Sequence, residues 1–129
     1  MNNSIIDLII RIKNAYLARK EKISSPHSGF KEDVTKKLKE LGYLKSYQIQ
    51  KDGSKKNILL ELIYEDGVPA LTDVKIISRP GRRWYVGKKE LKPVLGGLGY
   101  AIVSTPQGIL TSIEAKKNQT GGELLFEIW

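Results

Sequence analysis

The chain has 129 residues, of which 40% are hydrophobic, so it is long enough to form one domain or two small ones around a packed core. Its 22 Lys and Arg residues outnumber its 14 Asp and Glu residues, and the net charge of +8 favours a polyanionic partner, nucleic acid before an anionic membrane. The lack of cysteine excludes disulfides and thiolate chemistry, and a single histidine excludes a multi-histidine metal site, so we expect no metal and no cofactor.

The apolar runs of the chain are short, and one of the longest, 58–64, cannot span a bilayer. The N-terminal residues do not form a basic stretch followed by an apolar signal core. We therefore expect a cytoplasmic protein.

The first forty residues have the spacing of two amphipathic helices. Apolar residues recur at helical intervals over 5–16, and Ser4 is the predicted N-cap. A second helix is predicted to start after Ser28 as its N-cap and to end at Gly42. Both helices carry basic residues outside their apolar stripes.

Two strands are predicted to follow these helices. Residues 43–51 and 55–64 alternate between apolar and polar, and Asp52-Gly53 between them is a strong hairpin signal. An α-β-α-β-β unit therefore ends near Glu65. Because 66–69 reads as a linker or turn, we place a domain boundary there, with an N-terminal unit at 1–66 and a C-terminal unit at 67–129.

The C-terminal unit is predicted to consist mostly of antiparallel strands. Residues 71–77 resemble a strand, Arg79-Pro80-Gly81 makes a turn, and 83–86 is expected to pair back before a short helix at about 88–95. Two further strand-like runs lie within 97–111 and flank a hydroxyl-rich turn.

A short helix and a last strand complete this unit. The sequence from Thr111 to Glu114 fits a capping box, the helix is expected to reach about Asn118, and Gly121-Gly122 ends it. Residues 123–129 then form a strand in which Leu124, Phe126 and Ile128 are expected to share one face. The predicted class is α+β with two small units.

The turn from Ser104 to Gly108 is the strongest functional signal. Short hydroxyl side chains on a stiff turn can reach the sugar edges and unpaired bases of RNA, and the basic residues of the chain can hold phosphates. Ser104, Thr105, Gln107 and Gly108 are therefore candidate RNA-binding residues.

Basic residues gather in two further places. Around Trp84 and Tyr85, one of which is expected to face inward and Tyr85 outward, lie Arg79, Arg82, Arg83, Lys88 and Lys89. The helices supply a second surface, expected to contact the RNA backbone, of Arg11, Lys13, Asn14 and Lys31.

Other chemistries find little support in the sequence. The glycine-rich segment 96–99 follows a predicted helix and opens a strand, whereas phosphate-binding loops follow a strand and open a helix. His27 has no convincing nucleophile or base nearby in the sequence, and the carboxylates show no recognisable acid/base or metal motif. We therefore predict that the chain is not an enzyme.

Several motifs in order resemble the family of the eighth protein of the bacterial small ribosomal subunit. They cover nearly the whole chain, and no single one is decisive, but their order and spacing are highly specific. The motifs are Asp7-Leu8 with Arg11–Ala15, Leu38–Glu40 with Gly42–Leu44, Ser78–Gly81 with Arg83 and Tyr85, Gly97–Thr111, and Gly121–Glu123.

The resemblance implies a structural protein that binds the central domain of small-subunit (16S-type) ribosomal RNA at an irregular internal loop and supports subunit assembly and translation. Neighbouring ribosomal proteins are implied partners, and relatives also bind their own messenger RNA. In the family, a hydroxyl-rich turn and a glycine-glycine-glutamate motif contact the RNA. By this resemblance, the turn contacts correspond to Ser104, Thr105 and Gly108, and those of the second motif to Gly122 and Glu123.

The chain departs from the family pattern at two places. Pro106 and Gln107 stand where the family usually has serine and lysine, so a hydroxyl and a charge are missing from the turn. Pro26-His27-Ser28-Gly29 replaces the family's Pro-Ser-Ser-Lys before the second helix.

Two other classes stay open on charge alone: a nucleic-acid-processing enzyme such as a nuclease, and a general DNA- or RNA-binding module. Bacterial and organellar ribosomes are not distinguished by the sequence.

Overall fold

The computed structural model describes residues 3–90 and 98–129. The chain divides into two compact units, one formed by Asp7–Leu71 and the other by Met1–Ile6 with Thr72–Trp129. Both combine helix with antiparallel sheet, which confirms the predicted α+β class.

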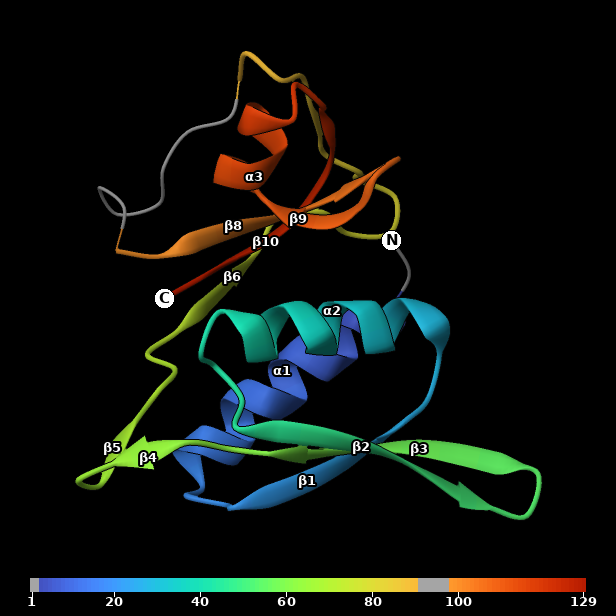
Figure 1. The fold of residues 1–129 in the computed structure, drawn as a ribbon, viewed down its shortest axis with the longest axis vertical. Coiled ribbons are helices and arrows are strands. Elements are labelled where there is room, and N and C mark those ends of the chain that lie inside the picture. Colours follow the sequence, from blue (N-terminus) through green and yellow to red (C-terminus); the bar gives the residue numbers. More distant parts are fainter. Residues whose placement is uncertain (1–2, 91–97) are drawn as a thin grey trace. The chain divides into compact units, whose positions relative to one another are not determined.

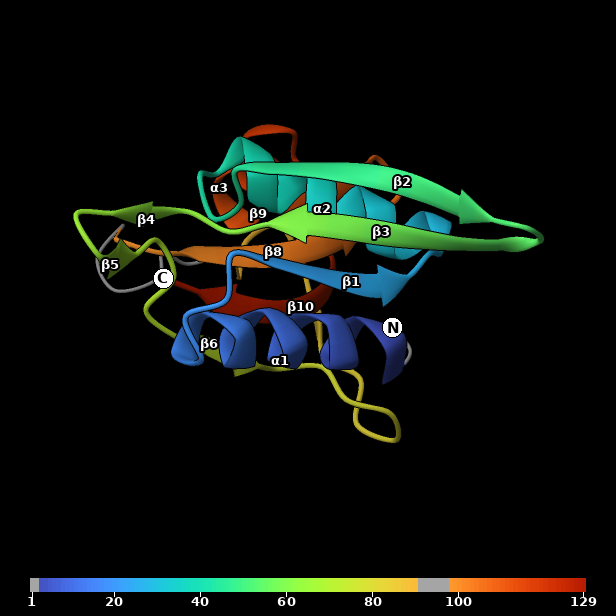
Figure 2. The same cartoon turned by 90° about the horizontal axis from the view of Figure 1, so that it is seen from below.

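The unit Asp7–Leu71 has the predicted α-β-α-β-β order. Its three-stranded antiparallel sheet has the strand order β1-β3-β2, and both helices lie on one face of it (Figures 1 and 2). Ile58 and Leu60 of the central strand are fully buried. The elements are α1 (Asn3–Leu17), β1 (Lys22–Pro26), α2 (Gly29–Glu40), β2 (Ser46–Asp52) and β3 (Lys55–Glu61).

Both ends of α2 follow the sequence signals, and the start of α1 does not. Ser28 is the N-cap of α2, and its hydroxyl accepts a hydrogen bond from the Lys31 amide. Ser4 lies inside α1 rather than before it, so the prediction of Ser4 as N-cap was wrong. Gly42, which has φ of 89°, follows the C-cap of α2 as predicted.

Both predicted turns of this unit are present. The hairpin of β2 and β3 turns at Gly53, where φ is 64°. The segment predicted as a linker or turn is a second hairpin: β4 (Tyr64–Glu65) pairs with β5 (Val68–Pro69), and Asp66 and Gly67 between them both have positive φ.

The second unit is built around the strand β10. In its five-stranded antiparallel sheet, β10 pairs with β8 on one side and with both β6 and β7 on the other, and β9 follows β8. We expected 83–86 to pair back onto 71–77, which was wrong, because both segments pair with β10 instead. The strands are β6 (Val74–Ile76), β7 (Tyr85–Val86), β8 (Tyr100–Thr105), β9 (Gly108–Thr111) and β10 (Gly122–Ile128).

A β-bulge in β10 changes which side chains face the core. Leu124 pairs with Val103 but Phe126 pairs with Ile102, so Leu125 is an extra residue and the alternation shifts. Leu124 and Phe126 therefore lie on opposite faces, and the prediction that they share one was wrong.

The helix α3 (Ser112–Lys117) covers one face of this sheet, over β8 and β9 (Figure 1). The predicted capping box is present: the Thr111 hydroxyl accepts from the Glu114 amide, and the Glu114 carboxylate accepts from the Thr111 amide. Beneath α3, Ala115 packs with Val103 and with the partly buried Val86, Leu110 and Leu124.

The helix predicted at 88–95 lies largely outside the described residues. Its described part, Lys88–Glu90, is a turn in which the Glu90 amide donates to the Gly87 carbonyl at 3.0 Å. Residues 96 and 97 of the glycine segment 96–99 also fall outside the described range.

Candidate nucleic-acid interface

The start of β10 brings together two segments that the sequence marked separately. Glu123 is directly opposite Tyr85 of β7 on one side and Ser104 of β8 on the other, and Ser104 is opposite Ile109 of β9. Residues directly opposite in antiparallel strands point to the same face. Tyr85, Glu123, Ser104 and Ile109 therefore form one row across four strands, on the face opposite α3.

Two glycines allow the backbones in this row to approach each other. A Cβ built on Gly122 would lie 2.0 Å from the Ser104 carbonyl oxygen, and one on Gly121 would lie 2.4 Å from the Val86 carbonyl oxygen. No side chain fits at either position without moving a neighbouring strand. Gly122, which the resemblance placed among the RNA contacts, thus sets the spacing between β8 and β10.

The basic residues Arg79 and Arg82 belong to a tight hairpin. Their backbones exchange two hydrogen bonds, of 3.1 and 2.9 Å, across the turn Pro80-Gly81, and φ of Gly81 is 79°. Proline followed by a residue with positive φ is typical of a type II turn. We call residues 79–82 the arginine hairpin.

Both ends of the arginine hairpin are fixed to β10. Before it, the Ser78 amide donates to the Leu125 carbonyl at 3.2 Å, and after it the Leu124 amide donates to the Trp84 carbonyl at 2.8 Å. These bonds lie at the bulge of β10, so the extra residue Leu125 provides the carbonyl to which the hairpin is attached.

A buried carboxylate lies beneath this attachment. Glu123 is only 7% exposed, and its Oε2 accepts from the Ser78 hydroxyl at 2.5 Å and from Arg83 Nη1 at 3.4 Å. Burial acts to raise the Glu123 pKa, but hydrogen bonds, among them those donated by Ser78 and Arg83, are part of an opposing effect that lowers it by more. The pKa therefore lies below its ordinary value, and Glu123 is ionised at neutral pH.

Of the two hydroxyl groups at the turn between β8 and β9, one is hydrogen-bonded within the turn and the other is not. Thr105 Oγ1 donates to the Gly108 carbonyl at 2.9 Å and accepts from the Gln107 amide at 3.1 Å. The Ser104 hydroxyl has no hydrogen-bond partner within 3–90 and 98–129. Pro106 and Gln107 are exposed at the tip, and Gly108 has φ of 115°, which favours glycine there.

Two aromatic side chains next to this row are exposed. Tyr85 is 69% exposed, as expected, but Trp84 is 46% exposed, so the expectation that one ring faces inward was wrong. Trp84 precedes β7 and is held by its backbone rather than by its ring. The surrounding cations, all exposed, are Arg79, Arg82, Arg83, Lys88 and Lys89.

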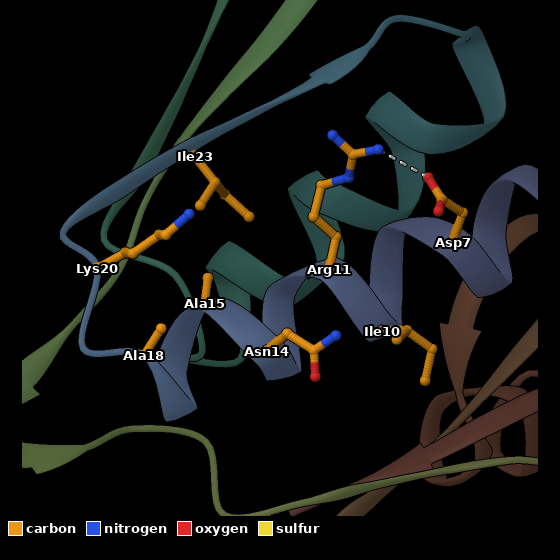
Figure 3. Close-up of a pocket in the computed structure, with 8 residues that line it drawn as sticks. All are labelled: Asp7, Ile10, Arg11, Asn14, Ala15, Ala18, Lys20 and Ile23. Atoms are coloured by element: carbon orange, nitrogen blue, oxygen red, sulfur yellow. Dashed lines mark hydrogen bonds and ion pairs between the residues drawn. The ribbon is translucent and has the colours of Figure 1, made fainter.

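A second basic surface lies in the unit Asp7–Leu71, along a groove between α1 and β1. The groove has a volume of about 390 Å³, and the side chains of Arg11 and Lys20 both reach into it (Figure 3). Arg11 donates to the Asp7 carboxylate at 3.2 Å and to the Ser24 carbonyl at 3.1 Å. Asn14 also lines the groove, so this part of the predicted surface is assembled in one place.

Lys13 and Lys31 differ from Arg11 and Asn14 in burial. Lys13 is half-buried, and Lys31 is only 5% exposed, with Nζ donating to Ser25 Oγ at 3.0 Å and to the Pro26 carbonyl at 3.1 Å. Burial lowers the pKa of Lys31, Asp7 opposes this shift and Arg11 adds to it. The Lys31 ammonium is thus directed into the protein.

Sequence reasoning left three residues of these surfaces out of the candidate RNA contacts, although it noted Lys20 outside the apolar stripe of the first helix and Ser78 in a family motif. Lys20 lines the groove, Lys22 lines an adjoining hollow that Arg11 and Lys20 also line, and their signal was the run of charges at 19–22. Ser78 is fully buried, and only its position before Arg79-Pro80 could have marked it.

Comparison with known proteins identifies the family. The model of the family "Ribosomal protein S8" matches residues 3–129. The chain belongs to the ribosomal protein S8 family. It is 44% identical over 130 residues to the small ribosomal subunit protein uS8 of Rubrobacter xylanophilus, covering 100% of this chain and 98% of the relative. It is 41% identical to uS8 of Dictyoglomus thermophilum and 38% identical to uS8 of Pelagibacter ubique, each over 129 residues and with the same coverage.

The described residues of this S8-family chain contain neither a candidate metal site nor a membrane-spanning helix. In residues 3–90 and 98–129, no three or more carboxylate or histidine side chains are grouped so that they could hold a metal ion. In the same ranges, no helix has the length and apolarity that a membrane crossing needs.

Proposed function

We propose that this chain is a structural constituent of the small ribosomal subunit that binds the central domain of 16S-type ribosomal RNA. In this role it supports subunit assembly and translation. The observation that carries the proposal is the pairing of β7 and β8 with the same end of β10, which sets the arginine hairpin and the Ser104–Gly108 turn beside each other. Membership of the S8 family supports it.

In this proposal the second unit recognises an irregular internal loop of the RNA. Ser104 supplies a hydroxyl that the protein leaves without a partner, and the Gln107 side chain and the backbone at Gly108 lie at the tip beside it. Thr105 shapes the turn and keeps an acceptor lone pair for the RNA. Pro106 has no amide hydrogen, so the turn has fewer donors than its relatives would have.

The cations and the exposed ring act differently from the turn. Arg79, Arg82, Arg83 and Lys88 neutralise phosphates, and Tyr85 stacks on an unpaired base. In the other unit, Arg11, Lys13 and Asn14 contact backbone phosphates, and Lys31 supports that surface from beneath.

The proposal implies further partners and a location. Neighbouring small-subunit proteins and the chain's own messenger RNA are the partners we infer, and the ribosome of the cytoplasm is the location. An organellar ribosome would present the same RNA domain.

Binding to a central-domain RNA fragment across a salt series tests the phosphate contacts. If roughly four to six phosphates are neutralised, affinity should fall about a hundredfold or more between 50 and 200 mM salt. Arg82→Ala should reduce the slope of log affinity against log salt by about one, whereas Lys117→Ala, a charge-matched change on α3, should leave it unchanged. Equal slopes for Arg82→Ala and the wild type would reject the arginine hairpin as a phosphate contact.

Discrimination between RNAs tests the reading role of the turn. Ser104→Ala should weaken binding to the central-domain fragment by about 1 kcal/mol and binding to an unrelated duplex by much less. Equal losses on both would leave Ser104 without a reading role, and equal affinity of the wild type for structured DNA would favour a general binder. Incubation of labelled RNA with the protein and magnesium separates binding from cleavage, since a nuclease would shorten the RNA.

A further inference from the structure

The geometry points to Glu123 as a positioning residue for the arginine hairpin rather than a group that touches RNA. We propose that its buried carboxylate holds residues 79–83 in their binding conformation through Ser78 and Arg83. This inference rests on the proposed function for its effect on RNA, but its structural part concerns the free protein. It reassigns a residue that the family resemblance placed among the RNA contacts.

Burial and hydrogen bonding make the Glu123 carboxylate poorly accessible to RNA. The Glu123 side chain is 9% exposed, and its Oε2 already accepts from both Ser78 and Arg83. Ionised carboxylates accept hydrogen bonds and do not donate them, so an exposed Glu123 would repel RNA phosphates. At 9% exposure and with Oε2 already hydrogen-bonded twice, the Glu123 side chain presents little surface to RNA.

These partners lie on both sides of the arginine hairpin. Ser78 is fully buried immediately before it, and Arg83 follows it. The Ser78 oxygen, whose proton goes to Glu123, accepts the Trp84 amide hydrogen at 3.2 Å. One carboxylate thus connects the residue that enters the hairpin with the two residues that leave it.

The hairpin is otherwise held by backbone hydrogen bonds, those between Arg79 and Arg82 and those that join its ends to β10. Its four residues are exposed, and a Cβ on Gly81 would meet no atom within 4 Å, so the tip packs against nothing near that point. A loop held only by backbone bonds at its ends samples many conformations, and ordering it on binding weakens affinity. Fixing the side chains beneath the hairpin reduces that loss.

The free protein provides a spectroscopic test, because the chain has two tryptophans and one is Trp84. In a Trp129→Phe background, Trp84 is the sole tryptophan, and when it is excited selectively over the tyrosines it reports on the end of the hairpin. Glu123→Ala and Ser78→Ala should both lower its anisotropy and increase quenching by acrylamide. Glu123→Gln, whose amide oxygen still accepts from Ser78, should restore most of both, and Glu127→Gln on the same strand should change neither.

RNA binding then separates positioning from contact. Glu123→Ala should lower the affinity for the central-domain fragment by about three- to tenfold, as expected for one lost charge-assisted hydrogen bond. In an Arg79→Ala, Arg82→Ala, Arg83→Ala background, the same change should cost less than about twofold, because the arginines that Glu123 positions are gone. A full loss in that background, or unchanged Trp84 fluorescence in both Glu123→Ala and Ser78→Ala, would overturn the proposal.

The two proposals fail in different ways. If the wild type does not bind the RNA fragment, the proposed function is rejected while Trp84 still decides whether Glu123 positions the hairpin. If Glu123→Ala does not fold, as judged by circular dichroism, Ser78→Ala and Glu123→Gln test the same connection from its two ends. Unaltered Trp84 fluorescence in Ser78→Ala would then be the overturning result.

Discussion

Replacing Gly122 by alanine should destabilise the second unit by forcing two strands apart. The added Cβ would lie 2.0 Å from the Ser104 carbonyl oxygen and 3.1 Å from the Thr105 Cα, whereas real Cβ atoms essentially never come closer than 3.0 Å. Both neighbours belong to the backbone of β8, so no side-chain rotation can relieve the clash. The strands must separate by about 1 Å, which takes a normal hydrogen bond out of range.

The size of the effect follows from the bonds that this separation breaks. Gly122 adjoins the pair Glu123 and Ser104, where the ladder between β10 and β8 begins. Each lost backbone bond costs about 1 kcal/mol net, and a polar group left buried without a partner costs about 1–3 kcal/mol. One or two such losses lower the free energy of unfolding by about 2–4 kcal/mol, or the Tm by roughly 10 °C or more.

Thermal unfolding followed by circular dichroism measures this effect. Gly29→Ala is the matched control, because no atom lies within 4 Å of its added Cβ and Gly29 is the first residue of α2. It should leave the Tm unchanged or raise it slightly, since alanine favours helix. A Gly122→Ala protein that unfolds at the wild-type temperature would refute the close approach of β8 and β10.

Four hydroxyl groups give further predictions. Tyr16→Phe should lower the free energy of unfolding by about 1–3 kcal/mol at pH 7 in urea titrations, because the Tyr16 hydroxyl accepts from the partly buried Ile63 amide and donates to the buried Tyr43 carbonyl. Burial raises the pKa of Tyr16 above its ordinary value of 10.0, so the unfolded chain ionises first and wild-type stability falls as the pH rises past 10.0; this fall should be smaller in Tyr16→Phe. Thr105→Ala should cost about 1 kcal/mol of stability, and Ser104→Ala less than about 0.5 kcal/mol, in the same titrations. Thr111→Ala removes the N-cap of α3 and should lower stability by about 1 kcal/mol, and an unaltered midpoint would speak against the capping box.

The elements that could be predicted from the sequence are those set by neighbouring residues. Ser28 and Thr111 cap helices because a short hydroxyl side chain reaches an amide two or three residues on. Asp52-Gly53 and the turn at 104–108 form hairpins because glycine adopts positive φ there. The position of the hydroxyl-rich turn was therefore predictable, and the use of Thr105 within it was not, since either hydroxyl could have faced solvent.

The rest depended on partners far away in the sequence. Leu124, Leu125 and Phe126 are all apolar, so alternation cannot reveal which of them is the extra residue of the bulge. Residues 83–86 are closer in sequence to β6, but their strand β7 pairs with the start of β10, where two glycines let the backbones approach closely. Burial of Lys31 was equally hidden, because its acceptors lie on β1 and its own helix position looks exposed.

The three residues Gly121, Gly122 and Glu123 allow a carboxylate to reduce the repulsion between neighbouring arginines without competing with phosphate for them. A hairpin with closely spaced arginines repels itself, and a nearby carboxylate relieves that repulsion. On the surface such a carboxylate would compete with phosphate for the arginines. Buried beneath Ser78 and Arg83, it would, on our proposal, fix the hairpin while Arg79 and Arg82 stay exposed and able to meet phosphate. The glycines make this placement possible, because only a strand without side chains at those positions can lie against both β7 and β8 and bring its glutamate beneath the hairpin.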